Sequence, residues 1–257
     1  MLKIASWNVN SLNVRLPQVL AWCDTAKPDI LALQETKLPD ERFPLDELRE
    51  AGYHSVYSGQ KTYNGVAILS REPASDPLTD IDGLDDPQRR ILAATVGNVR
   101  IIDLYVVNGA EVGSEKFDYK LHWLDKVSGW LAEEVQEHDN VVVLGDFNIA
   151  PDDRDVYDPE AWKERILCST PERQALERIL DIGFTDTFRL FEQEERIWSW
   201  WDYRMNMFRR KLGLRIDLIL ASESMAGRCT ASYVDIEPRR QERPSDHAPA
   251  VAEFKTS

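Results

Sequence analysis

The sequence has few cysteines and no long apolar run. Its three cysteines, Cys23, Cys168 and Cys229, lie far apart, form no metal-binding spacing and cannot all pair. We therefore expect free thiols and a reducing, cytoplasmic location. No apolar stretch approaches the roughly 20 residues that a membrane helix needs. The first residues, 1–4, lack the apolar core of a signal peptide, so we expect neither secretion nor a membrane partner.

The chain also lacks internal repeats, low-complexity linkers and breaks in composition. Hydrophobic residues make up 43% and charged residues 30% of its 257 residues, which is typical of a globular protein, and we expect one domain spanning residues 1–257. The formal net charge of −14 argues against nucleic acid as a partner. Two basic clusters oppose this balance, although a basic run is more often an exposed solvated face. They are Arg204, Arg209, Arg210, Lys211 and Arg215, and then Arg239, Arg240 and Arg243.

Apolar runs and helical spacings alternate along the chain, which predicts an α/β fold. The expected strands are Leu2–Val9, Ile30–Leu33, Tyr53–Tyr57, Gly65–Leu69, Ile91–Val96, Arg100–Val107, Val141–Leu144, Ile216–Leu220, Tyr233–Ile236 and Ala250–Phe254. The expected helices are Arg15–Ala26, Phe117–Gln136 and Pro171–Asp181. Thr170 is a plausible N-cap for the last of these helices, which Gly183 would close.

The stretch Val141–Pro151 places two polar residues at the end of an apolar run. After the expected strand, Gly145 interrupts the pattern, and Asp146 and Asn148 follow. Residues i and i+2 project to the same side of an extended backbone, so both side chains should point out of the carboxyl end of the sheet. Ligands usually lie at that edge in α/β proteins. The alternative is an ordinary turn, because Gly, Asp and Asn are common where strands end.

Several other strand ends carry the same kind of residue, so these polar residues form a set. They are Asn8, Glu35, Asp146, Asn148, Asp217, Asp246 and His247. Carboxylate and amide oxygens without a cysteine cluster suit a hard cation such as Mg²⁺ or Mn²⁺. Together with one histidine, they match metal-assisted phosphodiester hydrolysis, which needs a Lewis acid, a base for water and a stabiliser of the developing charge. Each member alone has a structural alternative, such as a strand-end cap, an exposed loop carboxylate or a turn, and only the joint set favours catalysis.

Short motifs spread over nearly the whole chain carry a resemblance to a known family. They are Trp7–Asn10, Leu33–Lys37, Gly59–Lys61, Gly65–Ala67, Gln88–Arg90, Tyr105, Leu144–Pro151, Trp198–Arg204, Gly213–Asp217 and Pro244–Pro249. In this order they resemble the exonuclease III / apurinic endonuclease family of DNA-repair phosphodiesterases. The resemblance implies the deoxyribonuclease I-like fold, a four-layer α/β sandwich in which two mixed sheets pack face to face between outer helices.

The same resemblance implies a role for each matched residue. Metal binding falls to Glu35, Asn8 and Asp246. The catalytic residues are Asp146 and Asn148 at the attacking water, His247 and Asp217 at the phosphate, and Tyr105 as a donor to the phosphate. The DNA-binding residues are Gln60, Arg90, Asn108, Trp200, Arg204, Leu214 and Ile216.

The implied function is that of a Mg²⁺- or Mn²⁺-dependent DNA-repair phosphodiesterase. It would be a monomer that acts as a 3′-5′ exodeoxyribonuclease and 3′-end processing enzyme on duplex DNA with 3′ ends, nicks or abasic sites. Abasic-site nicking would be a second, weaker activity. A catalytically silent nucleic-acid-binding regulator of the same fold is the alternative, and it should have lost ligands that this chain retains. A phosphoesterase for lipid or inositol phosphates is a weaker third hypothesis.

Three features depart from the family pattern or leave alternatives open. Many relatives have Gly or Asp-Gly where this chain has Asn10-Ser11, and the neutral Asn10 puts a second metal position in doubt. Some relatives carry Trp in place of Leu214, in the pocket for an abasic sugar that Trp200 and Ile216 would complete. Trp200 and its neighbour Trp201 could instead be core aromatics. In the variable loop Asp155–Cys168, Leu167 is either a wedge at the DNA or a core plug.

Overall fold

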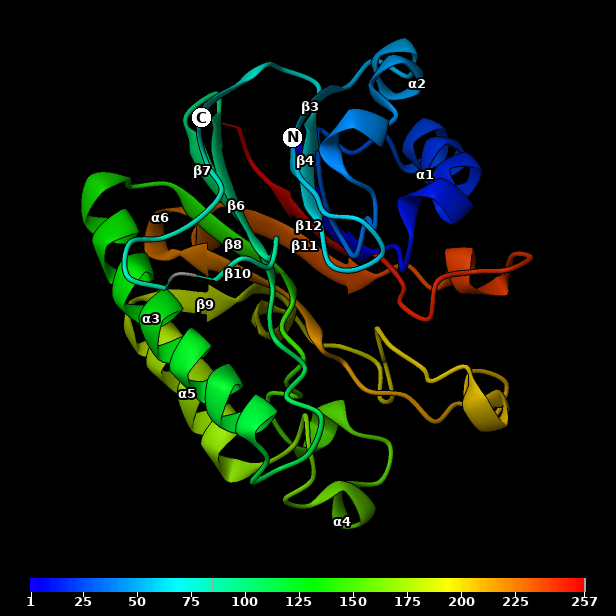
Figure 1. Cartoon of the computed structure of the whole chain (residues 1–257), viewed down its shortest axis with the longest axis vertical. Helices are drawn as coiled ribbons and strands as arrows, with labels where there is room; N and C mark the ends of the chain where they lie inside the picture. Colours follow the sequence, from blue (N-terminus) through cyan, green and yellow to red (C-terminus); the bar gives the residue numbers. More distant parts are fainter. Residues whose placement is uncertain (85, 257) are drawn as a thin grey trace.

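The computed structural model describes residues 1–84 and 86–256 and contains two six-stranded sheets. Residues 85 and 257, which belong to the expected 1–257 domain, lie outside this description. Both sheets are mixed, and helices cover their outer faces (Figure 1). This arrangement confirms the predicted four-layer α/β sandwich.

The first sheet has the order β11-β12-β1-β2-β4-β3. Its strands, in that order, are Cys229–Val234, Ala250–Phe254, Leu2–Asn8, Ile30–Gln34, Val66–Ser70 and His54–Ser58. Strands β1 and β2 run parallel, and Asn8 is in register with Gln34. The carboxyl ends of these two strands therefore meet at one edge of the sheet.

The second sheet has the order β5-β6-β7-β8-β10-β9. Its strands, in that order, are Ala74–Leu78, Ile91–Val96, Val99–Tyr105, Val141–Asp146, Asp217–Ser222 and Phe184–Asp186. Strands β7 and β8 run parallel, and Tyr105 is in register with Asp146. Because β10 runs antiparallel to β8, its first residue, Asp217, lies opposite Asp146.

Four longer helices form the two outer layers (Figure 1). Helices α1 (Leu12–Ala26) and α2 (Leu45–Glu50) lie beside the first sheet, and α3 (Glu115–Glu137) and α5 (Thr170–Asp181) lie beside the second. The shorter helices are α4 (Pro159–Trp162) and α6 (Glu223–Ala226), with 3₁₀ turns at Asp40–Arg42, Asp153–Asp155, Thr187–Leu190, Arg204–Asn206 and Glu237–Arg240. No helix in the described residues is long and apolar enough to span a membrane.

The core between the sheets is built by residues of alternate strand positions, as the period of two requires. Ile4 and Ile30 from the first sheet meet Ile101, Val142 and Ile219 from the second, and all five are buried. Two further cores lie between each sheet and its helices. The central strands are thus apolar on both faces over most of their length.

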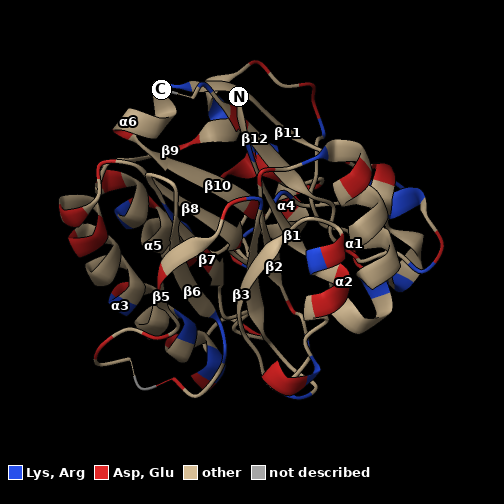
Figure 2. Ribbon diagram, turned by 90° about the horizontal axis from the view of Figure 1, so that it is seen from above, with Lys and Arg blue, Asp and Glu red and all other residues tan. Residues whose placement is uncertain are grey.

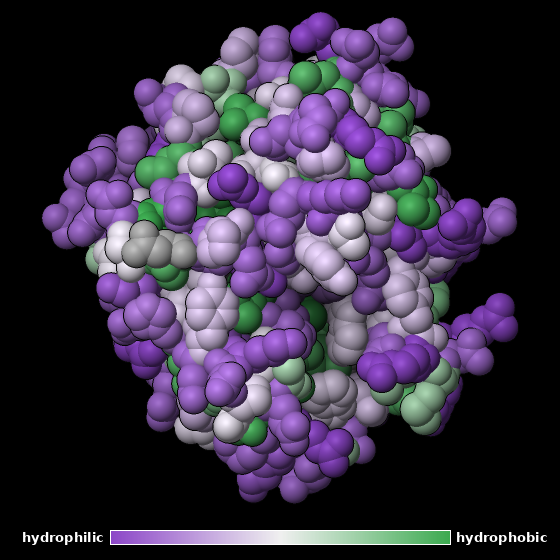
Figure 3. Space-filling view, viewed as in Figure 1, coloured by the Kyte–Doolittle hydropathy of each residue, from purple (hydrophilic) through white to green (hydrophobic). Residues whose placement is uncertain are grey.

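Charge is spread over the molecule rather than gathered on one face. Figure 2 shows Lys and Arg together with Asp and Glu on the helices that cover either sheet. In the space-filling view, the surface is mostly hydrophilic and is hollowed below its centre, where apolar side chains line the hollow (Figure 3). Basic residues are thus interspersed with acidic ones, although the net charge is −14.

Most expected elements are present, with shifts at their ends. Helix α1 begins at Leu12 rather than Arg15, and β11 begins at Cys229 rather than Tyr233. The predicted N-cap Thr170 is wrong, since Ser169 caps α5 in a reciprocal capping box with Glu172. The short strands β5 and β9 were not expected, because neither has a run of apolar residues and each lies at the edge of its sheet.

Gly145 generates a prediction about the strand that ends at Asp146. Its φ is +145°, and an added Cβ would lie 1.9 Å from the backbone oxygen of Leu104 in β7. We expect Gly145→Ala to lower the free energy of unfolding by roughly 3 kcal/mol, because either β7 or β8 must shift. Urea unfolding measures the change.

Gly129 in α3 is the matched control, because a Cβ added there meets nothing within 4 Å. Gly129→Ala should raise the free energy of unfolding by about 0.5–1 kcal/mol, the difference in helix propensity. Equal effects of the two substitutions would contradict the steric argument.

Candidate active site

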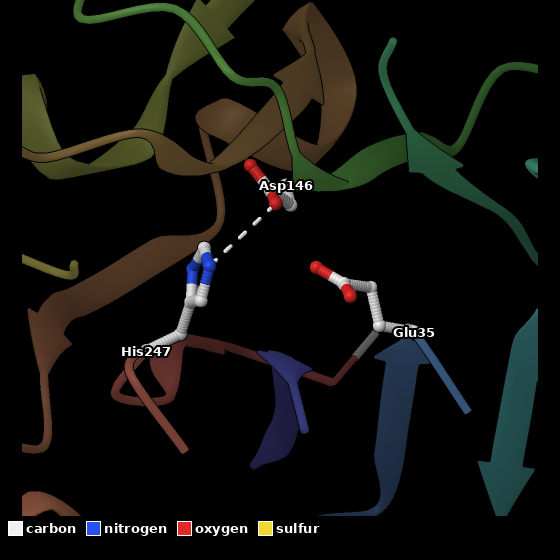
Figure 4. A group of neighbouring side chains, drawn as sticks. All are labelled: Glu35, Asp146 and His247. Carbon is white, nitrogen blue, oxygen red and sulfur yellow. Dashed lines mark ion pairs between the residues drawn. The ribbon is translucent and has the colours of Figure 1, made fainter. Parts of the chain in front are cut away.

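The polar strand ends of both sheets converge at one edge of the sandwich. The first sheet contributes Asn8 at the end of β1 and Glu35 directly after β2. The second sheet contributes Asp146 at the end of β8 and Asp217 at the start of β10. Figure 4 shows Glu35, Asp146 and His247 pointing into the space between the two sheets. The structure thus brings together residues that lie up to 239 positions apart in the sequence, from Asn8 to His247.

Asn8 joins the two sheets at this edge. Its amide nitrogen Nδ2 donates to Glu35 Oε1 at 2.8 Å and to Asp146 Oδ2 at 2.9 Å. Its amide oxygen Oδ1 accepts from the backbone N–H of Asn10 at 3.0 Å. Asn8 thus holds the carboxylates of Glu35 and Asp146 near each other. The family resemblance implies in addition that Asn8 lies beside the metal.

His247 is fixed between two carboxylates. Its ring nitrogen Nδ1 lies 2.9 Å from Asp217 Oδ2 and 3.1 Å from Asp217 Oδ1. Its other nitrogen, Nε2, lies 3.7 Å from Asp146 Oδ2 (Figure 4). All three side chains are buried. The expected pairing of His247 with Asp217 is therefore present, and Nε2 is directed toward Asp146 and the centre of the site.

The electrostatics of this group favour a protonated histidine. Burial alone would lower the pKa of His247, but the carboxylates of Asp217 and Asp146 outweigh it and raise the pKa to about 10. Burial raises the pKa of Asp146 to about 7, opposed by His247 and assisted by Asp217. Near neutral pH the site therefore holds an imidazolium beside a carboxyl group that can exchange a proton.

Three of the site residues could hold a metal ion. Ligand atoms of Glu35, Asp146 and His247 lie within 4.8 Å of one another. Two carboxylates at such a spacing suit a hard cation. Asp246, which the sequence had placed with the metal ligands, lies outside this group. It instead accepts a hydrogen bond from Asn10 Nδ2 at 2.8 Å and another from Trp200 Nε1 at 3.0 Å.

Lys37 is a site residue that the sequence reasoning missed. Its ammonium lies 2.8 Å from Glu35 Oε2 and donates to Asn10 Oδ1 at 2.6 Å. It therefore compensates part of the negative charge of Glu35 and joins Glu35 to the Asn10–Asp246 pair. The signal was available, because Lys37 is the last residue of the motif that contains Glu35.

Tyr105 lies beside the carboxylates of the site. Burial, followed by the charges of Glu35 and Asp146, raises its pKa well above the usual value, so the phenol keeps its proton. The Arg90 guanidinium lies over its ring, 4.5 Å from the centroid. Gln60, an expected DNA-binding residue, accepts from the backbone N–H of Arg89 at 3.0 Å. The predicted residues Gln60, Arg90 and Tyr105 are thus neighbours along one side of the site.

A hydrogen bond links Asn108 to Asn148, and a buried lysine binds the backbone oxygens of both. Asn108 Nδ2 donates to Asn148 Oδ1 at 3.0 Å, and the backbone N–H of Asn148 donates to Asp146 Oδ1 at 2.9 Å. The buried ammonium of Lys120 donates to the backbone oxygens of both asparagines and pairs with Glu172. Lys120 was also missed, although a lysine three residues after Phe117 on the apolar face of the expected helix was a usable signal.

The expected walls of a sugar pocket lie close to the histidine but are largely covered. Leu214 and Ile216 are each 1% exposed and pack with Leu167. Trp200 is half-buried and forms bridges with Leu214 and His247. Trp201 is a core aromatic. Of the two alternatives for Leu167, the core plug is the one observed.

The expected basic clusters are only partly exposed. Arg215, which belongs to the first cluster in the sequence, is buried and pairs with Asp155 and Asp186 at 2.6 Å and 2.7 Å. Arg239 is also buried and donates to the backbone oxygen of Ser245. The exposed basic residues of the two clusters are Arg204, Arg209, Arg210, Lys211, Arg240 and Arg243.

Comparison with known proteins identifies the family. Residues 5–247 match the family model described as Endonuclease/Exonuclease/phosphatase family. The exodeoxyribonuclease III of Haemophilus influenzae is 35% identical over 99% of this chain and 100% of its own length.

Similarity to solved structures points to the same family. NExo from Neisseria, described both as a 3′ phosphatase bound to a product DNA hairpin and as a 3′-5′ exonuclease, is 52% identical. Its TM-scores are 0.98, with 100% of both chains covered, and 0.97, with 99% of this chain and 100% of NExo covered. An AP endonuclease from Archaeoglobus fulgidus is 40% identical over the whole of both chains, with a TM-score of 0.95. The chain therefore belongs to the Endonuclease/Exonuclease/phosphatase family, and the predicted resemblance to its exonuclease III and AP endonuclease members is confirmed.

Proposed function

We propose that this protein is a Mg²⁺- or Mn²⁺-dependent DNA-repair phosphodiesterase that acts mainly at 3′ ends of duplex DNA. One observation carries the proposal: Asn8, Glu35, Asp146, Asp217 and His247 meet at one edge, with the hydrogen bonds that phosphodiester hydrolysis needs. Homologous nucleases and a 3′ phosphatase support the substrate class. A single domain over residues 1–257, a monomeric state and a cytoplasmic location belong to the same proposal, the last supported by three free cysteines.

In this mechanism Asp146 accepts a proton from the attacking water. Asp146 Oδ1 is held by the backbone N–H of Asn148, and Oδ2 is held by Asn8, so the carboxylate is oriented before substrate binds. Water attacks phosphorus, its proton passes to Asp146, and the bond to the leaving oxygen breaks. The pKa of Asp146, raised to about 7 by burial, makes it a usable base near neutral pH.

His247 stabilises the charge that develops on the phosphoryl oxygens. The imidazolium is held by Asp217 through Nδ1, which leaves Nε2–H free to donate to a phosphoryl oxygen. Tyr105, which keeps its proton, and the Asn148–Asn108 pair supply further donors beside it. A divalent ion held by Glu35, with Asp146 in reach, would supply Lewis-acid polarisation of the phosphate when bound.

One observation and one physical argument favour terminal substrates over internal abasic sites. Leu214, Ile216 and Leu167 are packed against one another, so an extruded sugar has little apolar space to enter. A 3′ terminus requires no extrusion of an internal nucleotide. The 3′ phosphatase and 3′-5′ exonuclease activities of NExo fit this preference, and the homologous AP endonuclease of Archaeoglobus fulgidus keeps weaker abasic-site nicking in the proposal.

The silent-regulator alternative is less consistent with the site. A protein that only binds nucleic acid has no need for a carboxylate group around a buried histidine, because unpaired buried charges are costly. Here Glu35, Asp146, Asp217 and His247 are all retained.

The decisive experiment compares three DNA substrates and one variant. Purified protein is assayed with Mg²⁺ on a recessed 3′ end, a 3′-phosphate at a nick and an internal abasic analogue, with and without a chelator. We expect the two 3′ substrates to be processed faster and the chelator to stop all three. Glu35→Ala should abolish activity with the fold intact, because it removes a ligating carboxylate. Faster cleavage of the abasic duplex would overturn the ranking, and near-normal turnover of Glu35→Ala at low Mg²⁺ would overturn the metal assignment.

Asp217→Asn should lower kcat about 100-fold, the order of effect seen when a transition-state donor is lost. Asp217 raises the pKa of His247, so its loss brings that pKa down from about 10. The imidazolium form of His247 is then lost at a lower pH than in the wild type, and the alkaline limb of the kcat–pH profile shifts to lower pH. Stopped-flow or gel assays from pH 6 to 10 measure both effects. If His247→Ala is inactive while Asp217→Asn keeps the wild-type profile, the pairing is wrong.

The exposed basic run Arg209–Lys211 should contribute to DNA binding through ionic contacts with phosphates, which weaken as the salt concentration rises. Each phosphate contact on duplex DNA adds about −0.9 to the slope of log K against log salt concentration. Replacing the three residues with Ala should weaken binding to all sequences and flatten this slope. The matched control replaces Lys116, Lys126 and Arg178, which are exposed on α3 and α5 over the outer face of the second sheet. Equal slopes for the two triple variants would show that the run is only a solvated face.

A further inference from the structure

A buried polar chain crosses between the two sheets just below the active site. It runs from Ser6 in β1 to Gln34 in β2 and on to Asp103 in β7. Gln34 Nε2 donates to Asp103 Oδ1 at 2.7 Å and to Ser6 Oγ at 3.1 Å. All three side chains are 0% exposed. None of the three has a role in the proposed chemistry, so their burial needs another explanation.

The position of this chain relative to the site is set by strand geometry. Ser6 lies two residues before Asn8, and Asp103 lies two residues before Tyr105, so each pair projects from the same face of its strand. Gln34 directly precedes Glu35. Asp103 is in register with Leu144, and Tyr105 is in register with Asp146. The Ser6–Gln34–Asp103 group thus forms the layer of the inter-sheet space next to the proposed catalytic residues.

The layers below it are apolar. Ile4 and Ile30 meet Ile101 and Val142 there, in contacts that depend little on direction. A hydrogen bond fixes the distance and orientation of its two groups much more tightly. The Gln34–Asp103 bond therefore sets the register of one sheet against the other at the level of the site.

Asp103 is the member of this hydrogen-bonded group whose burial costs the most free energy. Its Oδ2 atom is buried and has no hydrogen-bond partner among residues 1–84 and 86–256. Burial raises the pKa of Asp103 well above its usual range, although hydrogen bonds from Gln34 and the Ala67 backbone act in the opposite direction. A polar group kept in an apolar core at this cost is expected where it confers structural specificity rather than stability.

We propose that Gln34 and Asp103 are positioning residues that hold the two sheets in the register that places Glu35 and Asn8 of the first sheet against Asp146 of the second. The proposal rests on the proposed function of this site. Its consequence is that the 2.9 Å bond from Asn8 Nδ2 to Asp146 Oδ2, and the metal-binding group around it, depend on a contact that touches neither substrate nor metal.

The size of the effect follows from the tolerance of catalysis to displacement. A shift of about 1 Å in the relative position of catalytic groups can cost on the order of 100-fold in rate. The contact sits one strand layer from the site, so a partial shift is expected rather than a complete loss. We therefore expect loss of the link to lower kcat roughly 10- to 100-fold with little change in KM.

The test uses four variants in the full chain. Asp103→Leu removes the link, and Asp103→Asn keeps an acceptor for Gln34 in nearly the same shape. The double variant Gln34→Leu/Asp103→Leu replaces the polar pair with apolar groups. Ile101→Val, on the same strand and face as Asp103, is the matched control for a loss of core packing alone. Each is measured for kcat and KM on a recessed 3′ end, for Mn²⁺ affinity by calorimetry and for thermal midpoint, and Asp103→Leu is also crystallised.

The expected pattern separates positioning from stability. Asp103→Leu should lose kcat as above, bind Mn²⁺ several-fold more weakly and show an Asn8–Asp146 distance beyond hydrogen-bonding range. Asp103→Asn and Ile101→Val should keep kcat within about twofold of wild type, because the first keeps the link and the second leaves it untouched. The double variant should regain or exceed the wild-type thermal midpoint while kcat stays low.

Two results would overturn the proposal. One is a folded Asp103→Leu protein with wild-type kcat and wild-type Mn²⁺ affinity. The other is a double variant that recovers both its thermal midpoint and its kcat, which would make the pair a structural contact only. If the wild-type protein does not process DNA, the proposed function fails. The Mn²⁺ affinity and the Asn8–Asp146 distance then still decide whether the link positions the site.

Discussion

The site depends on keeping three carboxylates close together in a space from which water is largely excluded. Glu35 follows a strand of the first sheet, whereas Asp146 and Asp217 lie on neighbouring strands of the second, and the repulsion among these carboxylates is unfavourable unless donors compensate it. His247 lies between Asp217 and Asp146, and Asn8 donates to both Asp146 and Glu35. The same donors that make the charges tolerable also orient them, so stability of the site and readiness for catalysis have one cause.

This constraint explains the unusual backbone around the site. Glu35, Asn10, Lys37 and Asn148 all have positive φ values between 45° and 54°, a region that non-glycine residues seldom occupy. Each follows a strand end by one to three residues. Strained backbone persists only where surrounding contacts determine it. Here the contacts are the hydrogen bonds among these same side chains, which supports a preorganised site rather than one assembled by substrate.

The polar residues at strand ends could be predicted from the sequence, whereas the roles of polar residues inside helices and strands could not. Asn8, Glu35 and Asp146 could be predicted because a polar residue after an apolar run is visible along the chain. Lys120 and Asp103 could not be assigned a role, because their neighbours come from other elements and only the packed fold brings them together. Similarly, nothing local distinguishes the buried Arg215 from the exposed basic residues near it, so the basic cluster read from the sequence includes a residue that the fold buries.

The distribution of charge explains how an acidic protein can act on a polyanion. The net charge of −14 repels DNA at long range, but repulsion between exposed charges fades over about 10 Å at ordinary salt. In the proposed function, Lys37 and the His247 imidazolium would attract a phosphate at shorter range, because their charges are half-buried or buried and therefore less screened. Attraction is thus concentrated where chemistry occurs. Weak general affinity with strong local binding suits an enzyme that must release a shortened or dephosphorylated strand after each cleavage.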